Sequence, residues 1–261
     1  MVVDSIVKSV SIIIPVYNEE PAIRELLRRV FKAALPDGIK RDVYVVDDGS
    51  TDSTVGHIDE FLTEYPQYKD SLHIFKSLVN HGKGAAVRAG FKLAKGDVII
   101  IQDGDLEYSP DDYPALLEPF KNPEVDVVYG SRFLRGTPKG MRKLNLLANL
   151  ILTTTTKLLY KTKLTDEATG YKVFRRSILD SITFKSRGFE FCPEFTSKVL
   201  SAGYTIVEVP IRYNARGILE GKKIKARDGF IAVWWLIKLR FAATSKKTEE
   251  KAKNKESRAL T

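Results

Sequence analysis

The chain has 261 residues, a formal net charge of +9 and 43% hydrophobic residues, enough for one sizeable α/β domain or two small ones. Its single cysteine, Cys192, excludes an internal disulfide framework and fits a reducing compartment. We expect a cytoplasmic protein that does not cross a membrane by itself. No run reaches the roughly 18 to 20 apolar residues of a spanning helix, and the amino terminus lacks an apolar signal segment.

The first part of the chain alternates apolar runs of strand length with helical patterns. Strands are predicted at 10–16, 43–46, 72–75 and 97–100. Between them, apolar or small residues recur at helical spacing within 23–31, 58–62 and 85–90. This alternation with short connections predicts an α/β fold in which a mostly parallel sheet is wrapped by helices.

Three polar clusters follow these predicted strands, at 17–20, 47–52 and 103–107. In parallel sheets ligands bind outside the carboxyl ends of the strands. Asp103 and Asp105, on either side of a glycine, repel each other unless something positive lies between them. A hard divalent cation, Mg2+ or Mn2+, shared with substrate phosphates meets that need. A solvated acidic loop is the alternative for one Asp-x-Asp, but three clusters together favour a metal-using site.

The second part is less regular. The expected elements are a strand at Val125–Tyr129, a helix at Leu144–Leu159 interrupted at Thr153–Thr156, a short strand near 172–174, a helix after Glu194 and a strand at Ile206–Ile211. We predict one catalytic domain over residues 1–243. Lysine and glutamate dominate residues 244–261, which we expect to form a disordered tail.

The apolar segment at 229–243 fits two structures. One is a buried terminal helix. The other is an amphipathic helix in the membrane interface, with Trp234 and Trp235 at head-group depth and Lys238 and Arg240 on anionic lipid. Residues 144–160 fit the same interfacial role.

Other site chemistries find little support. Gly82-Lys83-Gly84 lacks the spacing of a dinucleotide or P-loop fingerprint, although Lys83 remains a candidate phosphate ligand. Three scattered histidines and one cysteine do not make a zinc site, and no Gly-x-Ser-x-Gly elbow occurs. The net charge of +9 prompts a nucleic-acid-binding alternative, but three acidic clusters would repel a phosphate backbone unless they held metal. We therefore expect no nucleic-acid partner.

Several motifs occur in a fixed order along residues 8–243: Ile14–Glu19 (IPVYNE), Val46–Asp52 (VDDGSTD), Asn80–Gly84 (NHGKG), Gln102–Glu107 (QDGDLE), Gly130–Phe133 (GSRF), Asp166–Phe174 (DEATGYKVF) and Glu220–Ile224 (EGKKI). In this combination the chain resembles family 2 glycosyltransferases, and more narrowly the polyprenyl-phosphate sugar transferases typified by dolichyl-phosphate mannose and glucose synthases. The resemblance implies a Rossmann-like GT-A fold. It also implies inverting transfer of a hexose from a nucleotide sugar to a polyprenyl phosphate, at the cytoplasmic face of a membrane.

The resemblance also assigns site residues. The donor pocket is expected to include Pro15, Tyr17, Glu19, Val46 and Asp48, the last facing the base or ribose. The expected metal ligands are Asp103, Asp105, Glu107 and the Gly104 carbonyl. Phosphates of donor or acceptor are expected to meet Arg132, Arg216, Lys222 and, for the acceptor, Arg142.

Some choices stay open at this point. Glu107 stands where mannose synthases often have glutamine, so both UDP-glucose and GDP-mannose remain candidate donors. A non-lipid or lipid-diphosphate glycan is the alternative acceptor. Asp166 and Glu194 fit either a general base or simple loop packing. Many relatives carry spanning helices after the catalytic domain, and a peripheral contact or a membrane-protein partner would replace them here.

Overall fold

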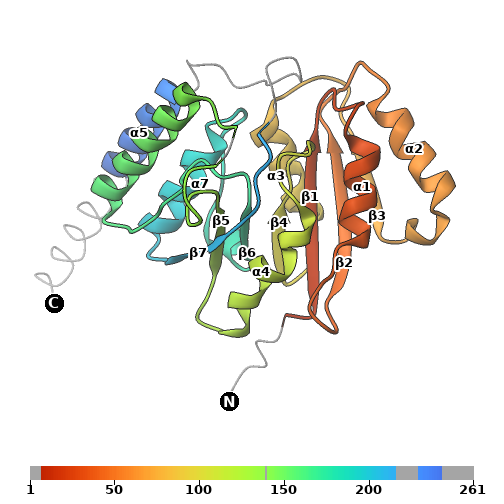
Figure 1. The fold of residues 1–261 in the computed structure, drawn as a ribbon, viewed down its shortest axis with the longest axis horizontal. Helices are drawn as coiled ribbons and strands as arrows, with labels where there is room; N and C mark the ends of the chain where they lie inside the picture. Colours follow the sequence, from red (N-terminus) through yellow and green to blue (C-terminus); the bar gives the residue numbers. More distant parts are fainter. Residues whose placement is uncertain (1–6, 139, 216–228, 243–261) are drawn as a thin grey trace, which may run out of the picture.

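The computed structural model describes residues 7–138, 140–215 and 229–242. Seven strands in these residues form one sheet, in the order β3-β2-β1-β4-β6-β5-β7 (Figure 1). Their bounds are β1 Ser9–Val16, β2 Lys40–Asp47, β3 Leu72–Lys76, β4 Val98–Ile101, β5 Val127–Ser131, β6 Lys172–Arg175 and β7 Ile206–Pro210. All neighbouring pairs are parallel except those of β6, which runs antiparallel to both β4 and β5. The predicted mostly parallel sheet is confirmed.

Helices cover both faces of this sheet. They are α1 Ile23–Lys32, α2 Thr54–Glu64, α3 Lys83–Leu93, α4 Tyr113–Leu117, α5 Lys143–Tyr160, α6 Ile178–Ser181 and α7 Phe191–Ser201, with single turns η1 Pro66–Tyr68, η2 Pro110–Asp112 and η3 Glu118–Lys121. One apolar core joins the sheet to α1, α2 and α4, and a second joins the opposite face to α3, α6 and α7.

The central strand β1 explains why two cores form. Successive side chains of a strand point to opposite faces, so Ile12 and Ile14 enter the core beside α1 while Ile13 enters the core beside α3. All three are fully buried. An unbroken apolar run is what such a doubly covered strand requires.

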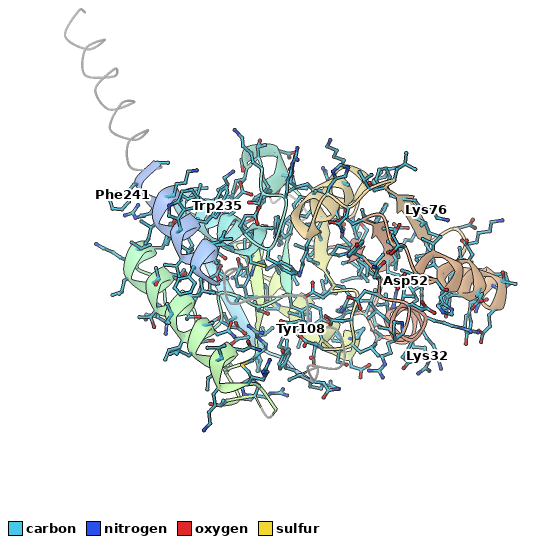
Figure 2. The ribbon with its side chains drawn as sticks, turned by 90° about the horizontal axis from the view of Figure 1, so that it is seen from above. Lys32, Asp52, Lys76, Tyr108, Trp235 and Phe241 are labelled. Atoms are coloured by element: carbon cyan, nitrogen blue, oxygen red, sulfur yellow. The ribbon has the colours of Figure 1, made fainter. Side chains whose placement is uncertain are left out.

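At one side of the sheet, α5 packs against the helix formed by residues 229–242 (Figures 1 and 2). Leu152 of α5 is buried with Ala232 and Leu236, and the Tyr160 hydroxyl donates to the Leu236 carbonyl oxygen at 3.0 Å. The predicted terminal helix therefore exists and is buried along one stripe only. No described helix has both the length and the apolar content that a membrane span needs.

Several sequence-based boundaries differ from the structure. The helix expected after Glu194 begins at Phe191, so Glu194 lies inside it. The expected break at Thr153–Thr156 does not occur, because α5 is continuous from Lys143 to Tyr160. The Thr156 hydroxyl donates to the Leu152 carbonyl oxygen one turn earlier at 2.9 Å, which satisfies the side chain inside the helix. The fifth strand covers Val127–Ser131 rather than Val125–Tyr129, so the strand runs closer to Arg132 than expected.

Candidate active site at the carboxyl edge of the sheet

The loops after β1, β2 and β4 meet, because these strands are neighbours in the sheet. The Asn18 backbone N–H donates to Ser50 Oγ at 2.9 Å, and the Glu19 N–H donates to Thr54 Oγ1 at 2.9 Å. Gly104 lies so close to β1 that a Cβ there would be 3.0 Å from the Pro15 carbonyl oxygen. The predicted convergence of three acidic clusters is confirmed.

Asp103 and Asp105 differ in their surroundings. Asp103 forms an ion pair with Lys83 Nζ, and each of these side chains is less than one fifth exposed. Gly170 also approaches Asp103, since a Cβ on that glycine would lie 2.5 Å from Asp103 Oδ2. Asp105 is buried, and its Oδ1 accepts the Glu107 backbone N–H at 2.9 Å. Glu107 Oε2 in turn accepts the Tyr213 hydroxyl at 3.0 Å.

The carboxylates fit a divalent ion that is shared with a phosphorylated substrate. Within the described ranges, no three acidic, histidine or cysteine side chains form a ready metal cage. Mg2+ does not need one, because it is usually bound through one or two carboxylates together with water and substrate phosphates. Asp103 and Asp105 offer the oxygen ligands that Mg2+ and Mn2+ prefer.

Lys83 opens α3 and supplies positive charge beside these carboxylates. Burial is the largest single influence and lowers the pKa of Lys83, but the charge and hydrogen bond of Asp103, together with the charges of Cys192 and Asp105, raise it by more in sum, so the net pKa lies above its usual value. Lys83 is therefore protonated at neutral pH and can meet either a carboxylate or a phosphate. Its role as a phosphate ligand stays a prediction.

The predicted donor-pocket residues lie together at the ends of β1 and β2. Pro15 and Val46 are paired across the two strands, Tyr17 is half-buried, and Glu19 is buried. Asp48 is also buried, and its two oxygens accept the backbone N–H groups of His81 at 2.9 Å and Gly82 at 2.7 Å. The structure thus gives Asp48 a task that sequence reasoning missed, which is to hold the loop before α3.

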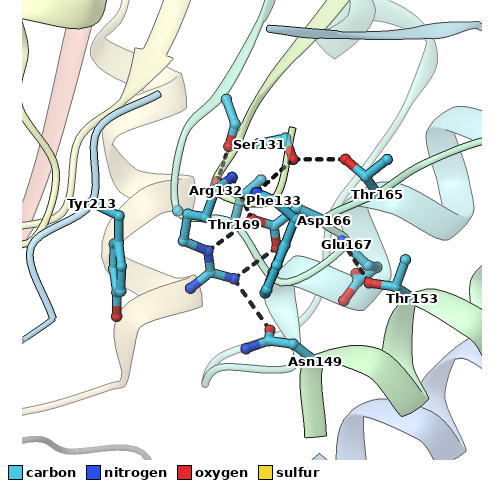
Figure 3. Close-up of polar contacts among 12 residues, drawn as sticks. Ser131, Arg132, Phe133, Asn149, Thr153, Thr165, Asp166, Glu167, Thr169 and Tyr213 are labelled. Carbon is cyan, nitrogen blue, oxygen red and sulfur yellow. Dashed lines mark hydrogen bonds and ion pairs between the residues drawn. The ribbon is translucent and has the colours of Figure 1, made fainter. Parts of the chain in front are cut away.

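Arg132 follows β5 and lies in a buried ion pair with Asp166 (Figure 3). Its Nε donates to Asp166 Oδ2 and its Nη2 to Asp166 Oδ1, both at 2.7 Å. The guanidinium also lies over the Tyr213 ring, 5.2 Å from the ring centroid. Burial is the largest single influence and lowers the pKa of Arg132, but the Asp166 carboxylate together with Tyr108 and Tyr213 raises it by more in sum, so the arginine stays charged. Tyr213 thus lies between Arg132 and Glu107.

The loop that carries Asp166 is held by residues that the sequence did not single out. Glu208 of β7 accepts the backbone N–H groups of Thr165 at 2.7 Å and Asp166 at 3.0 Å. Lys172 Nζ, which is buried, donates to the carbonyl oxygens of Glu167 and Thr169 at 2.9 Å each. In the sequence, the only indication of these roles was that Lys172 and Glu208 are charged residues within the short apolar strands β6 and β7.

For three of the residues predicted to bind phosphate, the structure describes no contact at the site. Arg216 and Lys222 lie outside the described residues. Arg142 is the N-cap residue of α5, and its side chain is exposed.

Glu194, one of two candidate bases, is buried and accepts the backbone N–H groups of Lys185 and Ser186 at 2.9 Å and 2.8 Å. These bonds match the loop-packing alternative.

Comparison with known proteins identifies the family. The protein-family model described as Glycosyl transferase family 2 matches residues 11–183. The chain belongs to this family. The dolichol-phosphate mannosyltransferase of Pyrococcus furiosus is 30% identical over 218 residues, which are 82% of this chain and 58% of that protein. This family 2 chain therefore spans less than two thirds of that relative's length. The undecaprenyl-phosphate mannosyltransferase of Micrococcus luteus is 32% identical over 221 residues, 80% of this chain and 85% of that protein.

Solved structures of low sequence identity support the fold. The glucosyl-3-phosphoglycerate synthase of Mycobacterium tuberculosis, crystallised with Mn2+, uridine diphosphate and phosphoglyceric acid, aligns with a TM-score of 0.65 and 18% identity over 90% of this chain and 78% of that one. The mannosyl-3-phosphoglycerate synthase of Rubrobacter xylanophilus aligns with a TM-score of 0.65 and 17% identity over 94% of this chain and 75% of that one. The expected GT-A fold is confirmed.

Proposed function

We propose that this family 2 glycosyltransferase moves a hexose, with inversion, from a UDP- or GDP-sugar to a dolichyl or other polyprenyl phosphate. The observation that carries the proposal is that the paired carboxylates Asp103 and Asp105 and the buried, charged Arg132 are linked through Glu107 and Tyr213. Such an arrangement suits two anionic substrates that must meet. The named activities of the curated relatives support the same class of donor and acceptor. A non-lipid or lipid-diphosphate glycan remains the alternative acceptor.

The donor side of the site is assigned to the loops after β1, β2 and β4. Pro15, Tyr17, Glu19, Val46 and Asp48 would line the nucleoside pocket. Asp103, Asp105, Glu107 and the Gly104 carbonyl would hold Mg2+ or Mn2+, which supplies positive charge against the donor diphosphate when bound. Relatives of the same fold crystallised with Mn2+ or Mg2+ and uridine diphosphate support this use of metal.

The reaction itself needs little proton transfer. An acceptor phosphate oxygen forms a bond to the anomeric carbon while the bond from that carbon to the diphosphate oxygen breaks. The nucleoside diphosphate leaves with the electron pair, and Lys83 and Arg132 stabilise the negative charge. A lipid monophosphate is already anionic near neutral pH, so no strong general base is required. Asp166 then serves to hold Arg132.

A lipid acceptor requires a membrane surface, and we assign that contact to α5 and the helix of residues 229–242. Leu144, Leu147, Leu150, Ile151 and Leu158 of α5 are exposed, as are Phe230, Ile231, Trp234, Ile237 and Phe241. Lys238 lies over the Trp234 ring at 4.5 Å, which suits a helix at head-group depth. A peripheral contact of this kind, or a membrane-protein partner, would place the site at the cytoplasmic face of the membrane.

The test of the function is transfer of radiolabelled sugar from a panel of UDP- and GDP-sugars to a polyprenyl phosphate, with Mn2+ or with EDTA. We expect metal-dependent label that extracts into organic solvent with one preferred donor, which would also decide between the glucose-type and mannose-type alternatives. Nucleotide-sugar binding without lipid product from any donor would contradict the acceptor assignment.

The membrane contact has a separate test. Leu147→Asp combined with Ile151→Asp should weaken binding to phosphatidylcholine and phosphatidylglycerol vesicles by about tenfold or more, because two exposed apolar side chains leave the interface. Deletion of residues 229–241 should also release the protein. Leu78→Asp is the matched control, since Leu78 is fully exposed on a loop after β3. Unchanged vesicle binding by the double variant would remove α5 from the membrane contact.

A further inference from the structure

Helix α5 has two opposite faces with different chemistry. Its buried stripe recurs at helical spacing and consists of Asn149, Leu152, Thr153 and Thr156, of which Asn149 is partly buried. The exposed stripe on the other side contains Leu144, Leu147, Ile151 and Leu158. The exposed stripe is explained by the proposed membrane contact. The membrane contact does not explain the two polar contacts that the buried stripe makes with the site.

The first contact is between Asn149 and Arg132. Arg132 Nη2 donates to Asn149 Oδ1 at 3.2 Å, in addition to its bond with Asp166. Asn149 Nδ2 donates to the Asn145 carbonyl oxygen at 2.9 Å, which fixes the direction of the amide. An asparagine can do both because its amide accepts at one end and donates at the other. A leucine could do neither, and an aspartate could only accept.

The second contact is one turn further along α5. The Glu167 backbone N–H donates to Thr153 Oγ1 at 3.2 Å, so the residue after Asp166 is also tied to the helix. Both members of the Arg132–Asp166 ion pair therefore have a bond to α5, directly or through the next residue, as Figure 3 shows. These bonds join segments that are 17 and 14 residues apart in the chain.

The bonds leave the guanidinium with a defined orientation. Nε and Nη2 form the edge that faces Asp166 and Asn149, while Tyr213 lies to the other side of Arg132 in Figure 3. Tyr213 donates to Glu107, which belongs to the acidic loop after β4. The side of Arg132 away from Asp166 thus faces Tyr213, which connects it to the acidic loop where the substrate phosphates would lie in the proposed function.

We propose that Asn149 is a positioning residue for the transfer reaction. With Asp166 it holds the Nε and Nη2 edge of Arg132, and Thr153 steadies the loop that carries Asp166. This inference rests on the proposed function, because it assigns Arg132 to a phosphate of the acceptor or donor. Since the other face of α5 contacts lipid in that proposal, the same helix sets the position of Arg132 relative to the membrane surface.

The test compares Asn149→Leu and Asn149→Asp with the control Thr154→Val, which changes an exposed position on the same helix. Kinetics use a short, water-soluble isoprenyl phosphate as acceptor, so membrane binding does not enter the measurement. Asn149→Leu should raise the acceptor KM or lower kcat by about tenfold, as expected for loss of a hydrogen bond to a charged group. Asn149→Asp, which adds a second carboxylate against Arg132, should raise the acceptor KM further, while Thr154→Val has no effect.

A second readout does not depend on activity. In 15N NMR spectra, rotation about the Cζ–Nη bonds of Arg132 should be faster in Asn149→Leu than in the wild-type protein, with the signal assigned by Arg132→Lys. Wild-type kinetics and wild-type rotation in a folded Asn149→Leu variant would overturn the proposal. If no polyprenyl phosphate accepts sugar from the wild-type enzyme, the proposed function fails, while the rotation rate still reports whether Asn149 positions Arg132.

Discussion

The two sides of the site are held in place by different kinds of contact. On the side of β1, β2 and β4, loops that directly follow neighbouring strands bond to one another, as Asn18 does to Ser50 and Glu19 to Thr54. On the side of β5, Arg132 depends on Asp166, which is 34 residues away in the chain. Asp166 itself depends on Glu208, 42 residues further on.

The two sides of the site should respond differently to the loss of a carboxylate. Asp103 and Asp105 line a site that a charged substrate must enter, and removing either carboxylate relieves repulsion between them. Asp166 instead compensates a buried guanidinium, whose side chain is only 7% exposed. Loss of a carboxylate on the first side should mainly affect activity, whereas loss on the second should affect stability more strongly, because the Arg132–Asp166 pair is more deeply buried than the Lys83–Asp103 pair.

The largest expected effect is on transfer. Asp103→Ala and Asp105→Ala should each abolish most sugar transfer, because the carboxylates proposed to hold the metal are lost. The fold should stay intact, and the loss of unfolding free energy should be smaller than for the Arg132–Asp166 pair, since the Lys83 and Asp103 side chains are 19% and 17% exposed. Asp59→Ala, at an exposed position on α2, is the control. Wild-type turnover of either variant with Mn2+ would contradict the metal assignment.

The second largest expected effect is on stability, and it should differ between the two sides of the site. Asp166→Asn should lower the free energy of unfolding by about 3–5 kcal/mol, because it leaves the buried charge of Arg132 without its counter-ion. Urea unfolding of this variant beside Asp103→Asn makes the comparison direct. Equal stability of the two variants would mean that the Arg132–Asp166 pair is no more important to the fold than the Lys83–Asp103 pair.

The sequence was informative where a residue's position follows from its own strand. The acidic clusters lie at 17–20, 47–52 and 103–107, directly after three predicted strands, and the carboxyl ends of neighbouring parallel strands meet. Arg132 follows its strand in the same way. The proposed roles of these residues as metal and phosphate ligands came from the family resemblance, and they remain predictions.

The sequence was less informative where a residue's partner is set by tertiary packing. Periodicity gave α5 as an apolar helix, but not that Asn149 faces Arg132, because that contact depends on where the helix lies against the sheet. The strand β6 was expected, but not its antiparallel insertion between β4 and β5. The continuity of α5 through Thr153–Thr156 depends partly on a side-chain bond that composition does not reveal.

The smallest expected effect concerns Glu167, which is fully buried next to Asp166. In the part of the chain that the structure describes, neither carboxylate oxygen has a hydrogen-bond partner. Burial raises the pKa of Glu167, and the nearby positive charge of Lys172 opposes that shift only in part. The folded protein thus keeps this proton to higher pH than the unfolded chain does.

The contribution of Glu167 to stability is therefore complete below the ordinary glutamate pKa of about 4.3 and is lost as the pH rises through the higher folded pKa. Glu167→Gln, which carries no titratable proton, should remove this loss. The variant should gain stability relative to the wild-type protein as the pH rises, when urea unfolding is measured between about pH 4 and pH 8. Glu118→Gln, at an exposed position, is the control. Parallel stability profiles for Glu167→Gln and the wild-type protein would show that the Glu167 carboxylate is compensated by a partner. An uncompensated buried carboxylate would then not be a difference between the two sides of the site.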